Sequence, residues 1–534
     1  MSTAPTNAPD PIPVVIVGAG PAGVTAATLL GQYGVECLVL DRWDGVYPQP
    51  RAVHLDDEVY RILGRVGIAE EFATVSRPTL GLQLVDRDHR VLAVFDREGD
   101  RGRHGHPQAN MFDQPELEHL LRANLEDQTT VGLRSNAEVT DVVAQDSHGR
   151  VRVDFTDRLT GAHESVLATY VLGCDGANSV VRASIGCTMR DLGFEQRWLV
   201  IDVDSEVGLD QWDGVHQVCD PHRAATFMRI GTTRYRWEFR LLDGESAADY
   251  DTVGAVLPLV GPWVRSVPQE RLELVRVAEY TFRAQIADHW RKGNVFLLGD
   301  AAHLTPPFIG QGLCAGLRDS MNLSWKLAAV LSGALPERVL DSYETEREPH
   351  ARAMIKLAKL IGAAMTQGGR TGDLLRRLAA PRLHLIPGLR DRILDSQTPP
   401  LRRSELVHRP WLRRSLAGRL CPNALLGESH RLDDVAEGGF LVVTTAAPTE
   451  EQRQRLLERG TRVLEVDAAS ELGTWLAEGH AVAALVRPDR TVMRASRDFA
   501  ALTAATPASF ACENRVGNAA TAMVGTLNCP SDCW

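Results

Sequence analysis

Cysteine is scarce in this chain, with nine residues among 534, and cations are outnumbered, with 58 Lys and Arg against 69 Asp and Glu. So few thiols in so long a chain do not suggest an oxidised, disulfide-held framework. The net charge of −11 offers no general attraction for nucleic acid or anionic lipid. Nucleic acid is therefore not expected as a partner.

Neither a membrane span nor a secretory leader is expected. Residues 11–35 carry no charge, which is long enough for a span, but the sequence GAGPAG at residues 18–23 has another explanation. No Lys or Arg precedes Arg42, so the positive region of a secretory signal is lacking. We expect a cytoplasmic protein without a membrane partner.

What the chain does have is an ordinary globular composition, with 44% hydrophobic and 24% charged residues. This argues against a disordered or collagen-like chain. At about 150 residues per domain, the length predicts roughly three structural units. Residues 1–12, rich in Pro, Ala and small polar residues, are expected to form a loose leader.

The N-terminal pattern predicts a βαβ unit, with strands over 13–17 and 35–40 and a helix over 24–33 after the glycine turn. Gly18 permits the tight turn, Gly20 lets backbone N–H groups approach a pyrophosphate, and Gly23 allows close helix–sheet packing.

Asp41 ends the second strand, close to the expected distance of about 20 residues beyond the turn, where it can accept hydrogen bonds from ribose hydroxyls. The glycine turn and this aspartate indicate a dinucleotide site, without separating NAD from FAD.

Strand-like and helical stretches alternate along the rest of the chain, which indicates an α/β fold with an inserted sheet. Strands are predicted at 82–85, 91–95, 151–155, 166–174, 198–203, 225–242 and 295–298, and helices at 114–125, at 315–331 and ending near 366. The last unit has predicted strands at 440–444, 462–466 and 481–487 and helices at 450–458 and 470–478. Residues 368–420 look like a connector, and the tail beyond about residue 500 has little periodicity.

One predicted strand region alternates in charge. Arg234, Arg236, Glu238 and Arg240 fall on one side, and aromatic or aliphatic residues fall on the other. The charged side is either a solvated face over a core or the roof of a pocket that supplies an Arg to a substrate carboxylate. The sequence does not choose between them.

Two further motifs lie far apart in the chain. The first is CDGANS at residues 174–179 with Arg182, and the second is GDAAH at 299–303, followed by PP at 306–307 and GQG at 310–312. Together with the N-terminal turn they resemble the three fingerprints of the class A flavoprotein aromatic hydroxylases. The resemblance implies a glutathione-reductase-like Rossmann FAD domain with an inserted antiparallel-sheet substrate domain.

The resemblance also implies roles for individual residues. Gly18, Gly20, Gly23 and Asp41 would hold the ADP half of FAD with Arg42 beside the adenosine, Asp175 would serve FAD and the nicotinamide cofactor, and Asp300 would touch the ribityl chain and pyrophosphate. The physical argument agrees for the late motif. Gly310 and Gly312 can expose backbone N–H groups to the flavin's pyrimidine edge, and the helix start at Leu313 adds a positive dipole end.

Arg51 and Gln114 look like family sites near the flavin. Arg51 can bind a flavin or nicotinamide phosphate as a permanently charged fork, or form a surface salt bridge. Gln114 can hydrogen-bond the flavin or simply start a helix. Cys314 stands where many relatives have Asn, and a buried structural thiol is the simpler interpretation.

Further stretches, among them HLDDE at 54–58, RWEF at 236–239 and GLCAGLRD at 312–319, resemble the 3-(3-hydroxyphenyl)propanoate hydroxylase branch of the family. The stretch ALVRPDR at 484–490 and the order of elements around it resemble the thioredoxin-like C-terminal extension of phenol hydroxylase relatives. No Cys-x-x-Cys pair occurs there, so disulfide exchange is not expected.

The implied division of the chain has four parts. Residues 12–190 and 275–400 form the FAD-binding domain, 191–274 the substrate-domain sheet, 401–500 the thioredoxin-like domain and 501–534 a tail. The third unit could make the contacts of a homodimer or cover the active site. No metal site is expected, because Cys512, Cys529 and Cys533 lack a fourth ligand at zinc spacing.

The implied reaction is hydroxylation of a phenolic aromatic acid such as 3-(3-hydroxyphenyl)propanoate, with NADH or NADPH reducing FAD and O2 then forming a flavin C4a-hydroperoxide. His54 is the first candidate for a proton relay, and Pro307 would shape the backbone beside the flavin. Rival interpretations are a tailoring hydroxylase of larger polyketide aromatics and a flavin-binding interaction module without turnover. The sequence leaves open the exact substrate, NADH against NADPH, the oligomeric state and the catalytic base.

Overall fold

The computed structural model describes residues 10–48, 51–97, 102–144, 149–366, 398–410 and 415–507. The predicted loose leader lies largely outside these ranges, and so do most of the connector at 368–420, the tail beyond 507 and the three cysteines within that tail. No helix in the described ranges combines the length and apolar character that crossing a membrane requires.

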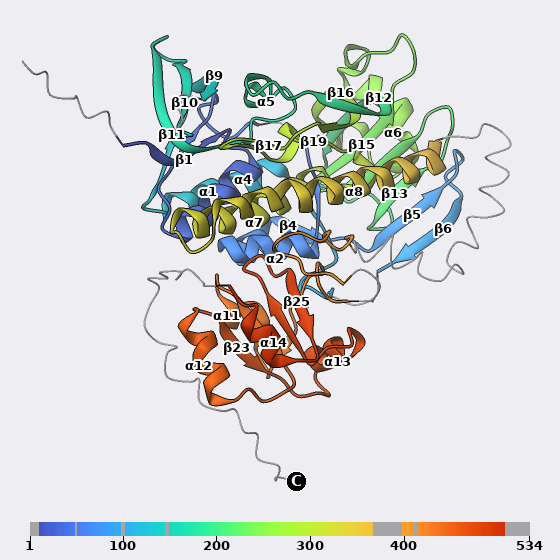
Figure 1. The fold of residues 1–534 in the computed structure, drawn as a ribbon. Coiled ribbons are helices and arrows are strands. Elements are labelled where there is room, and N and C mark those ends of the chain that lie inside the picture. Colours follow the sequence, from blue (N-terminus) through green and yellow to red (C-terminus); the bar gives the residue numbers. More distant parts are fainter. Residues whose placement is uncertain are drawn as a thin grey trace, which may run out of the picture.

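The first sheet is built around the predicted βαβ unit (Figure 1). Its central strand β1 (Ile12–Val17) pairs in parallel with β2 (Cys37–Leu40) on one side and with β11 (His163–Gly173) on the other. The other strands of this sheet are β8 (Val131–Arg134), β9 (Ala137–Ala144), β10 (Val151–Asp157), β17 (Arg291–Lys292) and β18 (Val295–Leu297).

Helices α1 (Pro21–Gln32), α4 (Gln114–Glu126) and α7 (Gly312–Leu331) pack together beside this sheet. The remaining helices of this region are α2 (Asp57–Val66), α3 (Ala69–Val75), α5 (Val180–Ser184) and α8 (Ser342–Thr366). A small sheet contains β3 (His54–Asp56), β7 (Ala109–Phe112) and β4 (Ser76–Pro78). In the chain, β3 directly precedes α2, β4 follows α3, and β7 precedes α4.

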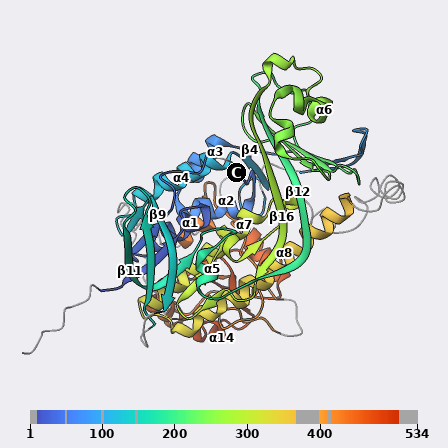
Figure 2. The ribbon, with the colours of Figure 1, turned by 90° about the horizontal axis from the view of Figure 1, so that it is seen from above.

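The second sheet stands apart from the first, and its long strands β12 (Met189–Asp204) and β16 (Glu273–Ala287) connect the two regions (Figure 2). It also contains β13 (Val215–Val218), β14 (Ala225–Arg229), β15 (Arg234–Arg240), β5 (Gly81–Val85), β6 (Val91–Asp96) and β19 (His303–Leu304). The sheet thus draws on residues well outside 191–274.

The predicted strand over 225–242 is wrong as a single element. The chain turns back at residues 230–233, and β14 and β15 pair with each other as an antiparallel hairpin. Gly231 and two threonines provide the turn, which the alternation of charged and aromatic residues obscures.

The aromatic face of β15 forms the core of this region. Tyr235, Trp237 and Phe239 are buried against α6 (Val253–Val264), whose Trp263 lies 6.4 Å from the ring of Trp237. Successive strand residues point to opposite faces, so the charged residues of β15 lie on the other side of the sheet.

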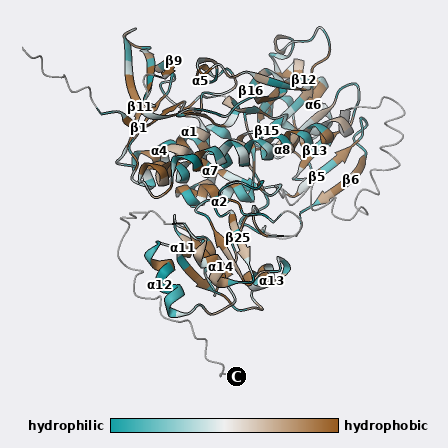
Figure 3. Ribbon diagram, in the orientation of Figure 1, coloured by the Kyte–Doolittle hydropathy of each residue, from teal (hydrophilic) through white to brown (hydrophobic). Residues whose placement is uncertain are grey.

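The C-terminal unit has a four-stranded sheet of β23 (Arg462–Glu465), β22 (Leu441–Thr444), β24 (Ala483–Val486) and β25 (Val492–Ser496). Its helices are α11 (Leu432–Ala436), α12 (Glu450–Glu458), α13 (Glu471–Glu478) and α14 (Phe499–Ala504). The predicted strands and helices of this unit are confirmed to within about two residues at each end, while β25, α11 and α14 lie outside the prediction. Figure 3 shows the hydrophobic strands inside and the hydrophilic α12 outside.

Candidate active site

The glycine turn after β1 is shaped by two close approaches. Gly18 has φ of +102°, and a Cβ there would lie 2.5 Å from the carbonyl oxygen of Cys174. A Cβ on Gly23 would collide with the carbonyl oxygen of Gly18. Only glycine fits at either position, so both residues serve the packing of the turn between β1, α1 and the end of β11.

Gly20 differs from these two glycines because the space beside it is empty. It caps α1 in an extended conformation without a side-chain hydrogen bond, and nothing lies within 4 Å of a Cβ built there. The first N–H groups of a helix have no partner within the helix and carry its positive dipole end. This helix end therefore has donors, positive potential and room for a phosphate group.

Asp41 holds the same turn from the end of β2. Its Oδ2 accepts from Ala19 N at 2.6 Å and its Oδ1 from Trp43 N at 2.7 Å, while Arg122 Nη2 lies 3.8 Å away. The exposed Arg42 side chain lies 5.2 Å from the Trp43 ring. Asp41 is thus a backbone anchor in the structure, and its contact with a ribose stays a prediction.

The middle motif follows β11, next to the glycine turn. Asp175 accepts from Ser179 Oγ at 2.6 Å and from Val181 N at 3.1 Å, and burial raises its pKa. Arg182 donates to the carbonyl oxygens of Ala177 at 2.8 Å and Ala301 at 2.9 Å. This arginine ties the middle motif to the late Gly-Asp motif, which lie far apart in sequence.

Asp319 on α7 organises the late motif and was not singled out in the sequence. Its carboxylate accepts from Gly299 N at 3.1 Å, pairs with His303 Nε2 at 2.7 Å and binds Arg347 Nε at 2.8 Å. Burial acts to raise the pKa of Asp319, but its contacts with His303 and Arg347 outweigh this effect and hold the pKa below its ordinary value. Asp300 sits in the turn that this cluster fixes and is half-buried.

His54 and the PP/GQG loop are brought together. Gly310 has φ of +61°, and a Cβ there would lie 2.7 Å from His54 Nδ1, so the imidazole packs directly on this glycine. Burial lowers the pKa of His54 to about 4, with Arg97 acting in the same direction. The ring is therefore neutral at pH 7.

The two segments are tied together by a buried charge cluster. Asp56 accepts from Gln311 Nε2 at 2.8 Å and from Arg318 Nη2 at 2.5 Å, and Arg318 Nη1 donates to Gln311 Oε1 at 2.8 Å. Gly312 and Leu313 then start α7, and nothing lies within 4 Å of a Cβ built on Gly312. This second helix end is open in the same way as that of α1.

The side chain of Gln114 forms hydrogen bonds with other residues of the protein. Its Oε1 accepts from the backbone nitrogens of Arg51 at 3.1 Å and Ala52 at 2.6 Å, and its Nε2 donates to Glu118 at 2.6 Å. It thus anchors the segment leading to His54, and a flavin contact by its side chain stays a prediction. The exposed side chain of Arg51 is available to a ligand.

The charged face of β15 is not solvated. Arg236 is 1% exposed and Glu238 8% exposed. Arg236 forms a buried two-point pair with Asp202, at 2.6 and 2.7 Å, and donates to the carbonyl oxygen of Arg51 at 3.3 Å. Of the two interpretations of this face, a solvated surface is wrong, because the face lies over the segment that carries His54.

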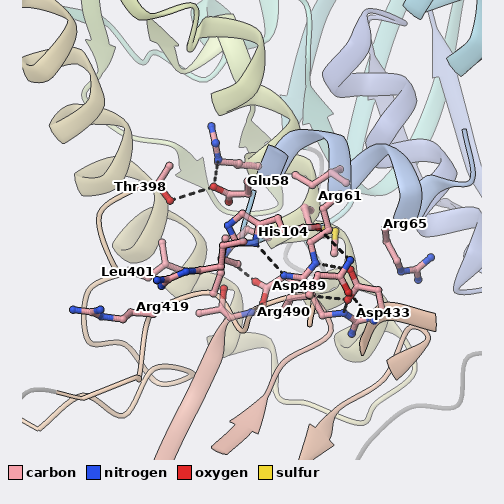
Figure 4. Close-up of a pocket in the computed structure, with 18 of the residues that line it drawn as sticks. Glu58, Arg61, Arg65, His104, Thr398, Leu401, Arg419, Asp433, Asp489 and Arg490 are labelled. Atoms are coloured by element: carbon pink, nitrogen blue, oxygen red, sulfur yellow. Dashed lines mark hydrogen bonds and ion pairs between the residues drawn. The ribbon is translucent and has the colours of Figure 1, made fainter. Parts of the chain in front are cut away.

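A separate cavity of about 1530 Å³ lies between α2, α7, α8 and the C-terminal unit (Figure 4). Charges from both sides meet there, since Asp433 pairs with Arg61 of α2 and with Arg490. Its lining contains none of the glycine-turn residues, although Arg318 and Arg347 reach it from the clusters described above. We interpret it as the crevice between two units that are held together.

A buried cluster beside this cavity holds the units together. Glu346 of α8 binds Arg487 of the C-terminal unit at 2.9 and 3.0 Å, Lys326 of α7 at 2.9 Å and Ser404 at 2.6 Å. Glu346, Arg487 and Lys326 are fully buried. Across the described ranges, no group of three or more His, Cys, Asp or Glu side chains is placed to hold a metal ion.

Comparison with known proteins gives a consistent result. The profile of a family described as FAD binding domain matches residues 11–358. A Rhodococcus jostii protein named "Probable NADH-specific resorcinol 4-hydroxylase" is 35% identical over 92% of this chain and 93% of its own length. A Burkholderia vietnamiensis protein named 3-(3-hydroxy-phenyl)propionate/3-hydroxycinnamic acid hydroxylase 2 is 32% identical, covering 90% and 92%.

Solved structures agree on the fold. The flavin-dependent monooxygenase PieE, in complex with FAD and substrate, superposes with a TM-score of 0.75 at 25% identity, covering 93% of this chain and 97% of its own. Aklavinone-11 hydroxylase with FAD and aklavinone has a TM-score of 0.78 at 23% identity, covering 93% and 99%.

Proposed function

Because this chain belongs to the FAD binding domain family and is an FAD-dependent aromatic hydroxylase, we propose that it hydroxylates a single-ring phenol, with an aromatic acid such as 3-(3-hydroxyphenyl)propanoate as the expected class. The observation that carries the proposal is the buried polar face of β15 over the segment of His54, beside the loop at residues 307–312. A polar, enclosed wall suits a small ring with a hydroxyl group.

The residues present fit FAD. The helix ends at Gly20 and Gly312 both have open space where a cofactor can approach the backbone. Gly18, Gly20, Gly23, Asp41 and Arg42 would hold the ADP part; Arg51, Gln114, Asp175, Asp300, Gly310, Gly312 and Leu313 would surround the rest. When bound, FAD takes a hydride from NADH or NADPH and activates O2 for transfer to the aromatic ring.

The proposed division of labour follows the expected domains. Residues 12–190 and 275–400 would form a glutathione-reductase-like FAD domain, 191–274 would supply the roof over the substrate, and 401–500 would form a thioredoxin-like cover. The buried Arg236–Asp202 pair supports the second role, because it joins the roof to the backbone of Arg51. A homodimer through the C-terminal unit is part of the same proposal.

Two residues of the chain would act nearest the reaction. His54, neutral at pH 7, would belong to the relay that carries the proton of the phenol away, and Pro307 would shape the backbone beside the ring. Burial of the site would exclude water, which otherwise favours release of hydrogen peroxide over hydroxylation.

A neutral dihydroxybenzene is the second candidate substrate. Arg236 is committed to Asp202, and Arg234 is committed to Asp113 and Asp204 at 2.8 Å each. Neither guanidinium is left over for a substrate carboxylate, which favours resorcinol-like rings.

The test is oxidation of NADH and of NADPH by the purified protein with 3-(3-hydroxyphenyl)propanoate, resorcinol or a polycyclic phenol, with product and hydrogen peroxide quantified. Product that matches the nicotinamide consumed identifies the substrate. A compound that stimulates NADH or NADPH oxidation but yields only hydrogen peroxide binds in a position unsuitable for oxygen transfer. Coupling only with the polycyclic phenol would contradict the single-ring proposal.

A further inference from the structure

We propose that Glu238 accepts the proton of the substrate's phenolic hydroxyl group, a role that rests on the proposed hydroxylation of a phenol. Three features of this side chain support it: the face of the sheet on which it lies, its burial, and the absence of a partner for its carboxylate among the described residues. None of these is visible in the alternation of the sequence, which places Glu238 on a face without saying what that face covers.

The register of the sheet fixes the surroundings of Glu238. It lies directly opposite Val200 of β12 and Thr226 of β14, and directly opposite residues share a face. The other face of the same strands packs on α6, so Glu238 points away from that core.

The neighbouring rows of this face touch the two segments of the candidate site. In the row of Arg236, Met228 packs in a cluster with Val53, the residue before His54. In the row on the other side, Trp198 lies 5.9 Å from the ring of Phe308, the residue after Pro307. Rows on one face are about 7 Å apart. Glu238 therefore lies between the contacts to the His54 segment and those to the Pro307 loop.

The side chain of Glu238 is buried, and its carboxylate is not used in the fold. The side chain is 8% exposed, and its carboxylate forms no hydrogen bond or ion pair with any residue that the structure describes. Burying a charge-bearing group without a partner is costly, and such groups gather at functional sites. Its neighbour Arg236 is already held by both oxygens of Asp202.

The electrostatics suit a proton acceptor. Burial raises the pKa of Glu238, Arg236 opposes this and Asp202 reinforces it. The facing segment adds Arg51, whose carbonyl oxygen binds Arg236, and the neutral His54. A raised pKa brings the carboxyl nearer to that of a phenol, about 10, than the pKa of about 4 at His54 allows.

The proposed step is a simple proton transfer. The O–H bond of the phenol breaks, an O–H bond to a Glu238 oxygen forms, and the negative charge moves from the carboxylate to the phenolate. The ring becomes more nucleophilic at the position that receives oxygen, and the proton returns when the product is reprotonated. No oxidant or reductant is involved in this step.

The experiment compares Glu238→Gln and Glu238→Asp with wild-type holoenzyme. Bound resorcinol or 3-(3-hydroxyphenyl)propanoate is titrated without oxygen, and its ionisation is followed by ultraviolet absorbance. Turnover and the product-to-peroxide ratio are then measured against pH. We expect Glu238→Gln to shift ionisation of the bound phenol upward by a pH unit or more and to lower hydroxylation at pH 7 about 100-fold, with recovery at alkaline pH. Glu238→Asp should stay within about tenfold of wild type.

Glu279→Gln is the matched control, since Glu279 belongs to the same sheet but pairs with Arg197 at the surface, at 2.7 Å. A Glu238→Gln enzyme with wild-type rate, product ratio and phenol ionisation would overturn the role of Glu238 alone. If this variant loses FAD, Glu238→Asp decides, because a carboxyl group at a different distance from the phenol should shift the pH profile of hydroxylation; an unchanged profile would overturn the role of Glu238. A wild-type enzyme that forms no product from any phenol overturns the proposed function itself.

Discussion

At the scale of single residues, the three glycines of the first turn do different work. Gly18 and Gly23 are required by backbone atoms of the protein, whereas Gly20 faces open space at the N-terminus of α1. Substitution can therefore separate folding from cofactor binding within one motif.

Gly18→Ala is expected to destabilise the protein by about 1–3 kcal/mol, because alanine is strained at positive φ and its Cβ meets the Cys174 carbonyl. Gly20→Ala should unfold like wild type without FAD but bind FAD at least about tenfold more weakly, since its Cβ occupies the space for the pyrophosphate. Thermal unfolding of the apoprotein and FAD titration check both. Equal losses of stability would contradict the distinction.

His54→Ala is expected to retain FAD and lower hydroxylation at least about tenfold, with more hydrogen peroxide. The low pKa of His54 means that wild type should show no rate change from this ring between pH 6 and 8. His222→Ala, at an exposed position, serves as the control. An unchanged rate and pH profile in His54→Ala would remove this residue from the mechanism.

At the scale of elements, the sequence predicts where many strands and helices lie but not which strands pair with each other. The strands around the glycine turn and in the C-terminal unit follow from apolar runs bounded by turns. The three-residue strand β3 is too short for such a pattern. The pairing of β13 with β5 joins segments more than 100 residues apart, which no local pattern encodes.

The site shows the same limit. The motifs predict Asp300 and Gly310, but the contacts of Asp319 with the late turn form only when α7 packs on the turn at residues 299–301 and on α8. Glu238 shares its face with Arg236, whose hydrogen bond to the Arg51 carbonyl joins β15 to a segment 185 residues earlier, and no local pattern encodes that contact.

Glu346 on α8 offers a test of how helices hold the C-terminal unit. Glu346→Gln leaves Arg487 and Lys326 buried with weaker partners, and we expect a loss of about 3–5 kcal/mol in unfolding free energy. Burial acts to raise the pKa of Glu346, but the charges of Arg487 and Lys326 outweigh this effect and hold the pKa well below its ordinary value. The stability from this group is thus present above about pH 4.3 and is lost as the pH falls further.

Thermal unfolding of Glu346→Gln and wild type between pH 3 and 8 measures this. Glu451→Gln, at an exposed helical pair with Arg455, should change the free energy of unfolding by less than about 0.5 kcal/mol. Similar effects of the two variants would show that the buried cluster contributes nothing beyond a surface pair.

At the scale of the whole molecule, the C-terminal unit binds α2 and α8 through buried ion pairs, and α8 is in turn paired with α7. Asp433 binds Arg61 of α2, which begins just after His54, and Arg487 reaches α8, which is tied through Lys326 to α7. The C-terminal unit thus contacts the supports of the site without supplying any residue of the motifs.

Truncation near residue 400 is expected to lower both stability and turnover, because Glu346 and Arg61 lose buried partners. Solution mass and coupled turnover of the shortened chain check this. An unchanged oligomeric state would exclude dimer contacts as a role of this unit, and unchanged turnover would exclude its role as a cover of the active site.

The order of strands in the first sheet also governs how the protein emerges from the ribosome. β1 lies between β2 and β11, and β18 joins beyond β11, so the cradle of the three motifs closes only after α7 has been made. At about 5–20 residues per second, synthesis to that point takes on the order of tens of seconds. In the first part of this time, until β11 has been made, β1 has a free edge that can pair with other chains. FAD cannot stabilise the nascent chain at this stage, because the three motifs that would bind it are not yet all present.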